Sequence, residues 1–248
     1  MKKQDDMSEI TYMNYSNSTP WPDKDIWHDH TYKAIVSIVE QWLQKYTNSE
    51  MVLLNAGSGG TEYKTNAKVI HLDIVEKYIS QFDNYLVGSV ENIELPDASL
   101  DGIICVGSVI NYADAQRTIA EFSRLLKPNG FLILEFERSN SAEFLWTSQH
   151  NKYIFQKEYN YNNQKHLLWM YSEKHICQLL EQYDINLQFI KRIHELSSFL
   201  YRIGVTEEKA APFSKYDSLC KFISYPLAHN TILLGRRCEI FSVNSDLL

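Results

Sequence analysis

The fold of this chain is decided by the stretch Val52-Leu53-Leu54-Asn55-Ala56-Gly57-Ser58-Gly59-Gly60-Thr61-Glu62. An apolar run enters this stretch, a polar segment leaves it, and three of the nine glycines of the chain fall within four residues. This pattern is typical of a buried parallel strand that ends in a turn where backbone approaches a ligand closely. Because ligands of open α/β sheets bind at the carboxyl ends of such strands, the turn predicts a cofactor site.

From residue 51 onward, apolar runs alternate with segments of helical periodicity. We expect strands over residues 52–56, 69–74, 85–90, 102–106 and 131–136, and helices over 61–67, 76–82 and 113–126. An amphipathic helix over 31–46 precedes them. Further strands over 185–193 and 231–236 would complete the sheet. The pattern predicts an α/β fold: a Rossmann-like, seven-stranded, mostly parallel sheet with helices on both faces.

The flanking segments break the alternation. Residues 1–30 are polar and aromatic, which indicates an N-terminal arm or flap before a core at 31–138. We expect two substrate-side insertions, at 139–171 and 196–228, with the core completed by 172–195 and 229–248. The first insertion, a lid after the fifth strand, is predicted to hold strands over 153–161 and 166–171 around a turn at Asn162-Asn163, before a helix over 172–183.

Composition narrows the function classes. The net charge of −7 disfavours a general nucleic-acid binder, which needs a basic face. No apolar stretch is long enough to span a bilayer, and the N-terminus lacks the apolar core of a signal peptide. The four cysteines have no metal-ligand spacing, so we expect reduced thiols and a cytoplasmic location. Oligomeric state has no signature in the sequence.

Two cofactors suit a strand, a glycine turn and a helix. A dinucleotide needs G-x-G-x-x-G, because its pyrophosphate sits on the helix N-terminus, whereas here the third glycine, Gly60, is out of place. S-adenosylmethionine carries no phosphate, and its methionine part packs against the turn backbone. Asp73 ends the second strand, where its carboxylate can accept both ribose hydroxyls. Together with the turn, this favours the ribose role over a simple strand-end aspartate.

The run from Val52 to Glu137 resembles the class I S-adenosylmethionine-dependent methyltransferases, of the type 11 and type 25 kind. The resemblance rests on motifs that follow one another in the family's order and spacing. They are the first motif Leu54 to Thr61, the acid Asp73, the adenine segment Gly88 to Asp101, the fourth-strand end Ile104 to Tyr112, and the stretch Ile119 to Glu135 with its Leu125-Leu126-Lys127-Pro128-Asn129-Gly130 turn.

The resemblance implies S-adenosylmethionine as cofactor and S-adenosylhomocysteine as product. It assigns cofactor contacts to Asn55, Ala56, Gly57, Ser58, Gly59, Asp73, Ile74, Ser89, Val90, Val106, Gly107 and Ser108. The family usually has an acid at Asn55 and commonly one at Ser89. Both residues keep hydrogen-bonding capacity but lack the charge. A cofactor-binding or regulatory protein without catalytic activity is therefore an alternative function.

Candidates for acceptor contact lie in the arm and at strand ends. Tyr112 follows the fourth strand and is the residue we most expect beside the methyl group. Glu137 and Arg138 end the fifth strand, while Tyr15 and Trp27 belong to the aromatic arm. The arm aromatics either close over the ligand or simply pack on the core. No catalytic residue is identified, and His28, His30 and Glu137 are weak candidates for a base.

The pair His28 and His30 also suggests a metal, but no further ligands cluster nearby, so we expect none. Methyl transfer is an in-line displacement that depends mainly on positioning, and a base is needed only for a poor nucleophile. The acidic balance and the aromatic density of residues 139–171 favour a small-molecule acceptor over nucleic acid, with a protein or peptide acceptor as an open alternative, and we expect transfer to an oxygen or nitrogen atom. A nicotinamide-dependent oxidoreductase is disfavoured by the glycine spacing and by Gln116, which stands where Tyr112 would need a lysine partner.

Overall fold

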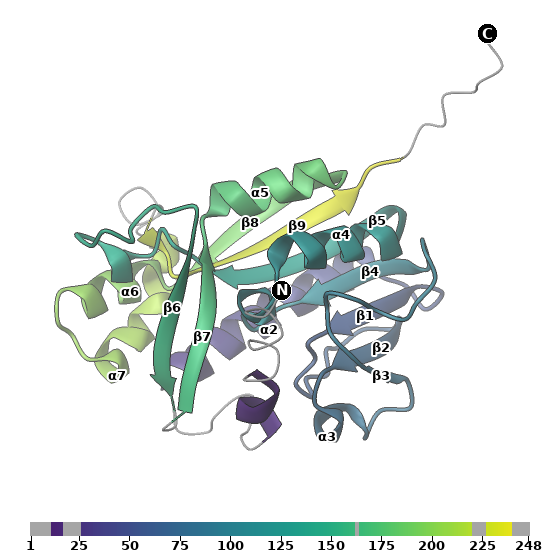
Figure 1. The fold of residues 1–248 in the computed structure, drawn as a ribbon, viewed down its shortest axis with the longest axis horizontal. Coiled ribbons are helices and arrows are strands. Elements are labelled where there is room, and N and C mark those ends of the chain that lie inside the picture. The colour runs from purple at the N-terminus through teal and green to yellow at the C-terminus, as the bar shows by residue number, and fades with distance from the viewer. Residues whose placement is uncertain (1–10, 17–25, 162–163, 220–226, 240–248) are drawn as a thin grey trace, which may run out of the picture.

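The computed structural model describes residues 11–16, 26–161, 164–219 and 227–239. Its centre is a seven-stranded sheet with the order β3-β2-β1-β4-β5-β9-β8 (Figure 1). The strands are β1 (Val52–Ala56), β2 (Lys68–Asp73), β3 (Tyr85–Val87), β4 (Leu100–Cys105), β5 (Leu126–Glu137), β8 (Ile185–Ile193) and β9 (Asn230–Arg237). Strands β1 to β5 pair in parallel, and β9 runs antiparallel to both of its neighbours. The predicted mostly parallel α/β sheet is confirmed.

Helices cover both faces of this sheet (Figure 1). The apolar side chains of α4 (Ala115–Leu125) and α5 (Glu173–Gln182) pack with Leu54 and Leu132 on one face. Those of α2 (Ile26–Tyr46) pack with Leu53 and Ile133 on the other face. Neighbouring residues of one strand thus enter opposite apolar clusters, which explains why β1 and β5 read as continuous apolar runs.

Local chemistry sets the ends of α4, which leads into the central strand β5. The Asp114 side chain accepts a hydrogen bond from the backbone N–H of Arg117 and caps the first turn. Ile119 and Phe122 lie on the buried face and are fully buried. The backbone becomes extended at Leu126, two residues before Pro128. Helix α4 therefore ends where strand β5 begins.

Several elements differ in length from the sequence prediction, such as β3, which ends at Val87 instead of residue 90, and two further segments differ more strongly. Residues 61–67 form no helix, because side chains hold them as a loop. The Asn55 amide donates to the Thr61 carbonyl at 2.8 Å, and the Thr65 and Thr47 hydroxyls are 3.0 Å apart. Helix α2 begins at Ile26 instead of residue 31, and the Thr31 hydroxyl donates to the Trp27 carbonyl one turn earlier. His28 and His30 therefore stand on a helix.

Two insertions stand beside the carboxyl ends of the parallel strands. The first contains the 3₁₀ turn η2 (Ala142–Phe144) and an antiparallel hairpin of β6 (Ile154–Tyr161) and β7 (Gln164–Tyr171). Its predicted turn at Asn162-Asn163 lies outside the described residues. The second contains α6 (Glu195–Arg202), α7 (Glu207–Ala210) and the 3₁₀ segment η3 (Ala211–Leu219). The short elements α3 (Glu76–Ile79) and η1 (Val109–Tyr112) follow β2 and β4.

One buried amide joins the hairpin to the sheet. Asn111 is fully buried, and its Nδ2 donates to the carbonyls of Glu137 at 3.0 Å and Trp169 at 2.7 Å. Its Oδ1 accepts from the Glu137 backbone N–H at 3.0 Å. One side chain thus connects η1, the end of β5 and the middle of β7.

Replacement of Asn111 by alanine is expected to lower the free energy of unfolding by about 2–4 kcal/mol, because buried backbone groups lose their partners. Urea unfolding of Asn111→Ala measures the loss. Asn92→Ala, which truncates an exposed amide, is the matched control. Equal midpoints for the two variants would show that the hairpin does not depend on Asn111.

Candidate active site

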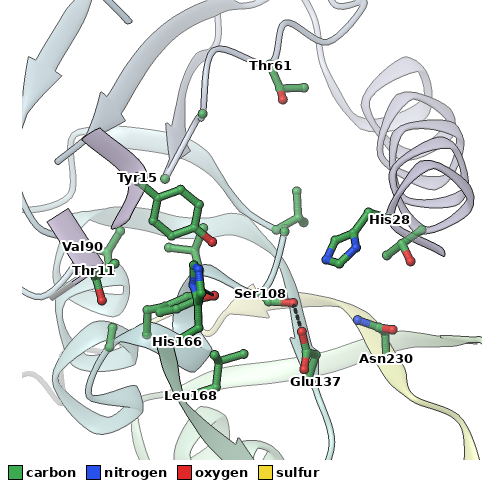
Figure 2. A pocket seen from close by; sticks show the side chains of 18 of the residues that line it. Thr11, Tyr15, His28, Thr61, Val90, Ser108, Glu137, His166, Leu168 and Asn230 are labelled. Carbon is green, nitrogen blue, oxygen red and sulfur yellow. Dashed lines mark hydrogen bonds between the residues drawn. The ribbon is translucent and has the colours of Figure 1, made fainter. Parts of the chain in front are cut away.

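A cavity of about 430 Å³ opens where four parallel strands end. It is bordered by Asn55 of β1, Asp73 of β2, Val106 after β4 and Glu137 of β5. Residues 11–16, the first turns of α2, the β6–β7 hairpin and α6 supply the remaining walls. Figure 2 shows Tyr15 and His28 projecting into this space from different elements, with Ser108 and Glu137 joined beneath them. The fold thus concentrates segments that are distant in sequence around one cavity.

The glycine turn after β1 forms one end of the cavity. Gly57 has φ +70°, and a Cβ there would come within 2.4 Å of the Val109 side chain, so only glycine fits. The N–H groups of Gly57 and Ser58 donate to the Leu72 carbonyl at 2.9 Å. Asn55 donates to the Thr61 carbonyl, a bond that a carboxylate is unable to make. Asparagine at position 55 therefore stabilises the closed turn.

Asp73 lies beside this turn and is itself part of its structure. Its Oδ2 accepts from the Gly59 N–H at 2.8 Å, and its Oδ1 accepts from the Val75 N–H at 2.9 Å. Burial raises the pKa of the Asp73 carboxyl above its ordinary value, although these backbone N–H groups oppose the shift. Each oxygen keeps accepting capacity beyond these bonds, so the carboxylate can also bind hydroxyl groups.

The backbone after β4 is held by a fully buried carboxylate. Glu135 Oε2 accepts from the N–H groups of Gly107 at 2.8 Å and Ser108 at 2.7 Å, and Oε1 accepts from Asn230 at 2.7 Å. These bonds keep Gly107 and Ser108 at positive φ angles of 82° and 58°. Burial nevertheless raises the pKa of Glu135 to about 7, because the donors offset only part of the desolvation.

This pKa predicts a pH dependence of stability. Folded Glu135 holds its proton to about pH 7, whereas the unfolded chain releases it at about pH 4.3. Stability from this group is therefore present at low pH and falls as the pH rises through this window, by on the order of 3 kcal/mol. Urea unfolding between pH 5 and 8 is expected to show a smaller fall for Glu135→Gln than for the wild type. The exposed control Glu94→Gln should follow the wild type, and parallel curves for all three proteins would contradict the assignment.

At the other end of the cavity, His229 lies between two carboxylates. Its Nε2 is 3.6 Å from Glu137 Oε2, and its Nδ1 is 3.7 Å from Glu143 Oε2. Although burial lowers the pKa of His229, both carboxylates raise it above its ordinary value. Burial alone would raise the pKa of Glu137, but its interactions with His229 and the Ser108 hydroxyl hold that pKa below the ordinary value. Glu137 and His229 therefore form a buried ion pair.

Aromatic rings surround this end. The Tyr159 hydroxyl donates to both oxygens of Glu143, at 3.0 and 3.1 Å. The Trp27 ring stacks on His194 at 4.2 Å and lies edge-on to His229 at 5.8 Å. Because His194 is fully buried, its pKa is lowered well below the ordinary value, and it serves as an uncharged platform for Trp27.

A second aromatic group lies between the two ends. The Tyr112 hydroxyl is 3.2 Å from His166 Nδ1, and Tyr15 packs edge-on to both rings at 5.6 and 5.9 Å. The backbone carbonyl of Tyr15 accepts from the Tyr78 hydroxyl, and Asn14 donates to the Lys165 carbonyl at 2.8 Å. Residues 11–16 thus connect the segment after β2 to the hairpin across the cavity.

Most residues predicted for the site line this cavity. They are Asn55, Gly57, Ser58, Gly59, Asp73, Ile74, Ser89, Val90, Val106, Gly107, Ser108, Tyr112, Glu137, Tyr15, Trp27 and His28. Ala56, His30 and Arg138 are not among the lining residues. Ala56 is buried in the apolar cluster. Arg138 is buried as well, beside the Ala228 carbonyl at 3.3 Å and Glu173 at 3.8 Å, because the chain leaves the strand end toward β7.

Sequence reasoning missed several lining residues on the insertions and at the start of β9. They are Glu143, His166, Tyr201, Glu207 and His229. The aromatic density of 139–171 was a general signal for this region, but no spacing rule connects Glu143 with His229. Among the described residues, no three His, Cys, Asp or Glu side chains are arranged to hold a metal ion. Within the same residues, no helix has the length and apolar character that crossing a membrane requires.

A profile of the family described as "Methyltransferase domain" matches residues 54–134, the segment from β1 to β5. Together with the fold, this match supports the resemblance of residues 54–134 to the class I S-adenosylmethionine-dependent methyltransferases. A methyltransferase domain is therefore what the family model and the fold support for this segment. No curated protein matches the sequence significantly.

Solved structures share the fold at low sequence identity. The 1,6-didemethyltoxoflavin-N1-methyltransferase of Burkholderia thailandensis, solved with 1,6-didemethyltoxoflavin and S-adenosylhomocysteine, is 15% identical with a TM-score of 0.61. The match covers 95% of this chain and 91% of that one. The geranyl diphosphate C-methyltransferase of Streptomyces coelicolor is 12% identical with a TM-score of 0.60, over 93% and 98% of the two chains. The [4+2]-cyclase SpnF is 10% identical with a TM-score of 0.52, over 81% and 80%.

Proposed function

We propose that this protein transfers the methyl group of S-adenosylmethionine to an oxygen or nitrogen atom of a small-molecule acceptor. The observation that carries the proposal is the single cavity that joins the glycine turn and Asp73 to Tyr112, His28 and Glu137. A cofactor at the strand ends would face an acceptor at the insertions within one enclosed space. The cavity volume is in the range of small-molecule sites, which favours a small acceptor over a macromolecule.

The residues present fit the cofactor. The turn at Gly57 to Gly59 borders the cavity, and glycine at position 57 lets it pack against Val109, because a Cβ there would come within 2.4 Å of that side chain. Asp73 would accept from the ribose hydroxyls, with Ile74 beside it. Ser89 and Val90 would border the adenine ring, and Val106 to Ser108 would lie under the reacting end. Asn55 would support the turn that holds the methionine part, and Ala56 would act only through the backbone.

The bound cofactor supplies a methyl group activated on a sulfonium. An acceptor lone pair forms the new bond to the methyl carbon, the S–CH₃ bond breaks, and its electron pair stays on sulfur. The protein would position the two groups in line and exclude water. Tyr112, Tyr15 and Trp27 would hold the acceptor. A hydroxyl or ammonium acceptor must also lose a proton, and of the histidines predicted as bases, His28 and His30, only His28 lines the cavity.

The insertions would form the substrate side of the domain, because Glu143, His166 and Tyr201 line the acceptor end. Asn55 stabilises the turn through its bond to the Thr61 carbonyl, so the lack of an acid at this position does not by itself favour a non-catalytic cofactor binder. We further propose a cytoplasmic location. Cys105, Cys177 and Cys238 are free thiols, which fits a reducing compartment.

Calorimetric titration with S-adenosylhomocysteine tests the cofactor site, with NAD as the control ligand. Micromolar binding of the former alone is expected. Asp73→Ala should weaken it at least tenfold, about 1.4 kcal/mol, through loss of the ribose bonds. Asp73→Asn keeps one backbone bond to the turn and should bind more weakly than the wild type but better than alanine. The exposed control Asp83→Ala should match the wild type, and unchanged affinity in Asp73→Ala would refute the ribose role.

Deletion of residues 1–25 tests the arm while leaving α2 complete. Removing Tyr15 opens the cavity between α3 and the hairpin, so turnover or S-adenosylhomocysteine retention is expected to fall about tenfold or more. The unfolding midpoint should stay close to that of the full chain, because the two large apolar clusters do not include residues 11–16. Unchanged binding and turnover would rule out the flap role.

A further inference from the structure

The charged side chains that line the cavity are mostly acidic. Five carboxylates line it, from Asp73, Glu91, Glu137, Glu143 and Glu207. Among the residues that the structure describes, neither lysine nor arginine is part of the lining. Three of the carboxylates, those of Glu137, Glu143 and Glu207, belong to the acceptor end. An acceptor that binds there meets a negative wall.

Much of this negative charge sits where solvent does not screen it. The side chains of Glu137 and Glu143 are each only 17% exposed. His229 faces both carboxylates, yet its nitrogens are 3.6 and 3.7 Å from their oxygens, and one imidazolium balances at most one of the two charges. Buried carboxylates are costly unless a cation or several hydrogen-bond donors pair with them. A bound cation would supply the missing compensation.

The surroundings of these carboxylates suit an organic cation. Trp27 lies edge-on to His229, Tyr159 donates to Glu143, and Tyr201 packs against Trp27 at 6.3 Å. Aromatic faces attract ammonium groups, most strongly in sites shielded from water. The combination of carboxylates and aromatic rings distinguishes this end from the glycine turn, where backbone N–H and carbonyl groups predominate.

We propose that the methyl acceptor is a small amine that carries a positive charge in solution and no anionic group, and that Glu137 and Glu143 bind its ammonium end among Trp27, Tyr159 and Tyr201. This inference rests on the proposed function and specifies the substrate class of the same cavity. Carboxylate and phosphate acceptors are disfavoured by the same wall, since they would add negative charge beside Glu137 and Glu143, which already share the imidazolium of His229.

Binding to the protein saturated with S-adenosylhomocysteine tests the proposal. The probes are 2-phenylethylamine and n-butylamine, each compared with the alcohol and the carboxylate of matching skeleton, namely 2-phenylethanol with phenylacetate and n-butanol with butyrate. At least one amine is expected to bind tenfold or more tightly than its carboxylate partner. That preference should shrink as ionic strength rises.

Variants assign the preference to named residues. Glu143→Gln keeps an acceptor for the Tyr159 hydroxyl and removes one charge, so the preference for amine over alcohol should fall about tenfold. Glu207→Lys changes an exposed residue at the cavity rim, so no core side chain is altered. It should also lower amine affinity. Glu94→Gln, exposed and outside the cavity, is the control with the same charge change as Glu143→Gln and should match the wild type.

The outcomes separate this inference from the proposed function. Failure to bind S-adenosylhomocysteine in the preceding calorimetric experiment counts against the cofactor site itself. With that binding intact, equal or tighter binding of the carboxylates overturns the cationic acceptor, and so does the absence of binding by both amines. An amine preference that survives unchanged in both Glu143→Gln and Glu207→Lys overturns the assignment to these glutamates.

Discussion

The cavity depends on one buried carboxylate, that of Glu135. Its two oxygens accept from the backbone after β4 and from Asn230 at the start of β9. Three strands are thereby held together at the edge where ligands bind. The bonds also keep Ser108 in a left-handed conformation, from which its hydroxyl reaches Glu137 at 3.0 Å. The cost of burying Glu135 is thus partly offset by hydrogen bonds that shape the wall of the site.

Two kinds of polar chemistry share the cavity. At the glycine turn, side chains such as Asn55 and Asp73 bond mainly to backbone and keep it in conformations that leave it open to a ligand. At the opposite end, Glu143 and His229 contact other side chains, and their charges are the feature available to a ligand. A cofactor common to a whole family suits the first end. An acceptor particular to this chain suits the second, because insertions vary more readily than strand ends.

The sequence prediction succeeded where a periodic pattern and a local turn coincide. The strand ending at Ala56 and the helix ending before Pro128 combine both signals, and the structure has them at those positions. The prediction failed at residues 61–67, where a bond from Asn55 replaces helical bonds. It also placed Arg138 toward the acceptor, although the side chain is buried beside Glu173. The first error comes from a local side-chain bond to backbone, which apolar periodicity does not register. The second comes from a partner 35 residues along the chain, outside the window on which periodicity depends.

By itself, the sequence determined the order of strands and helices, the glycine turn and the acid at the end of β2, because these follow from local periodicity and backbone sterics. It therefore also indicated the family and the cofactor. Only the tertiary structure decided which side chains form the end of the cavity opposite the glycine turn. Glu137, Glu143 and His229 come from β5, the following insertion and the start of β9, and they meet because β9 pairs antiparallel with β5. No local sequence signal predicts that these three side chains lie close together, since their proximity depends on pairing between strands that are distant in sequence.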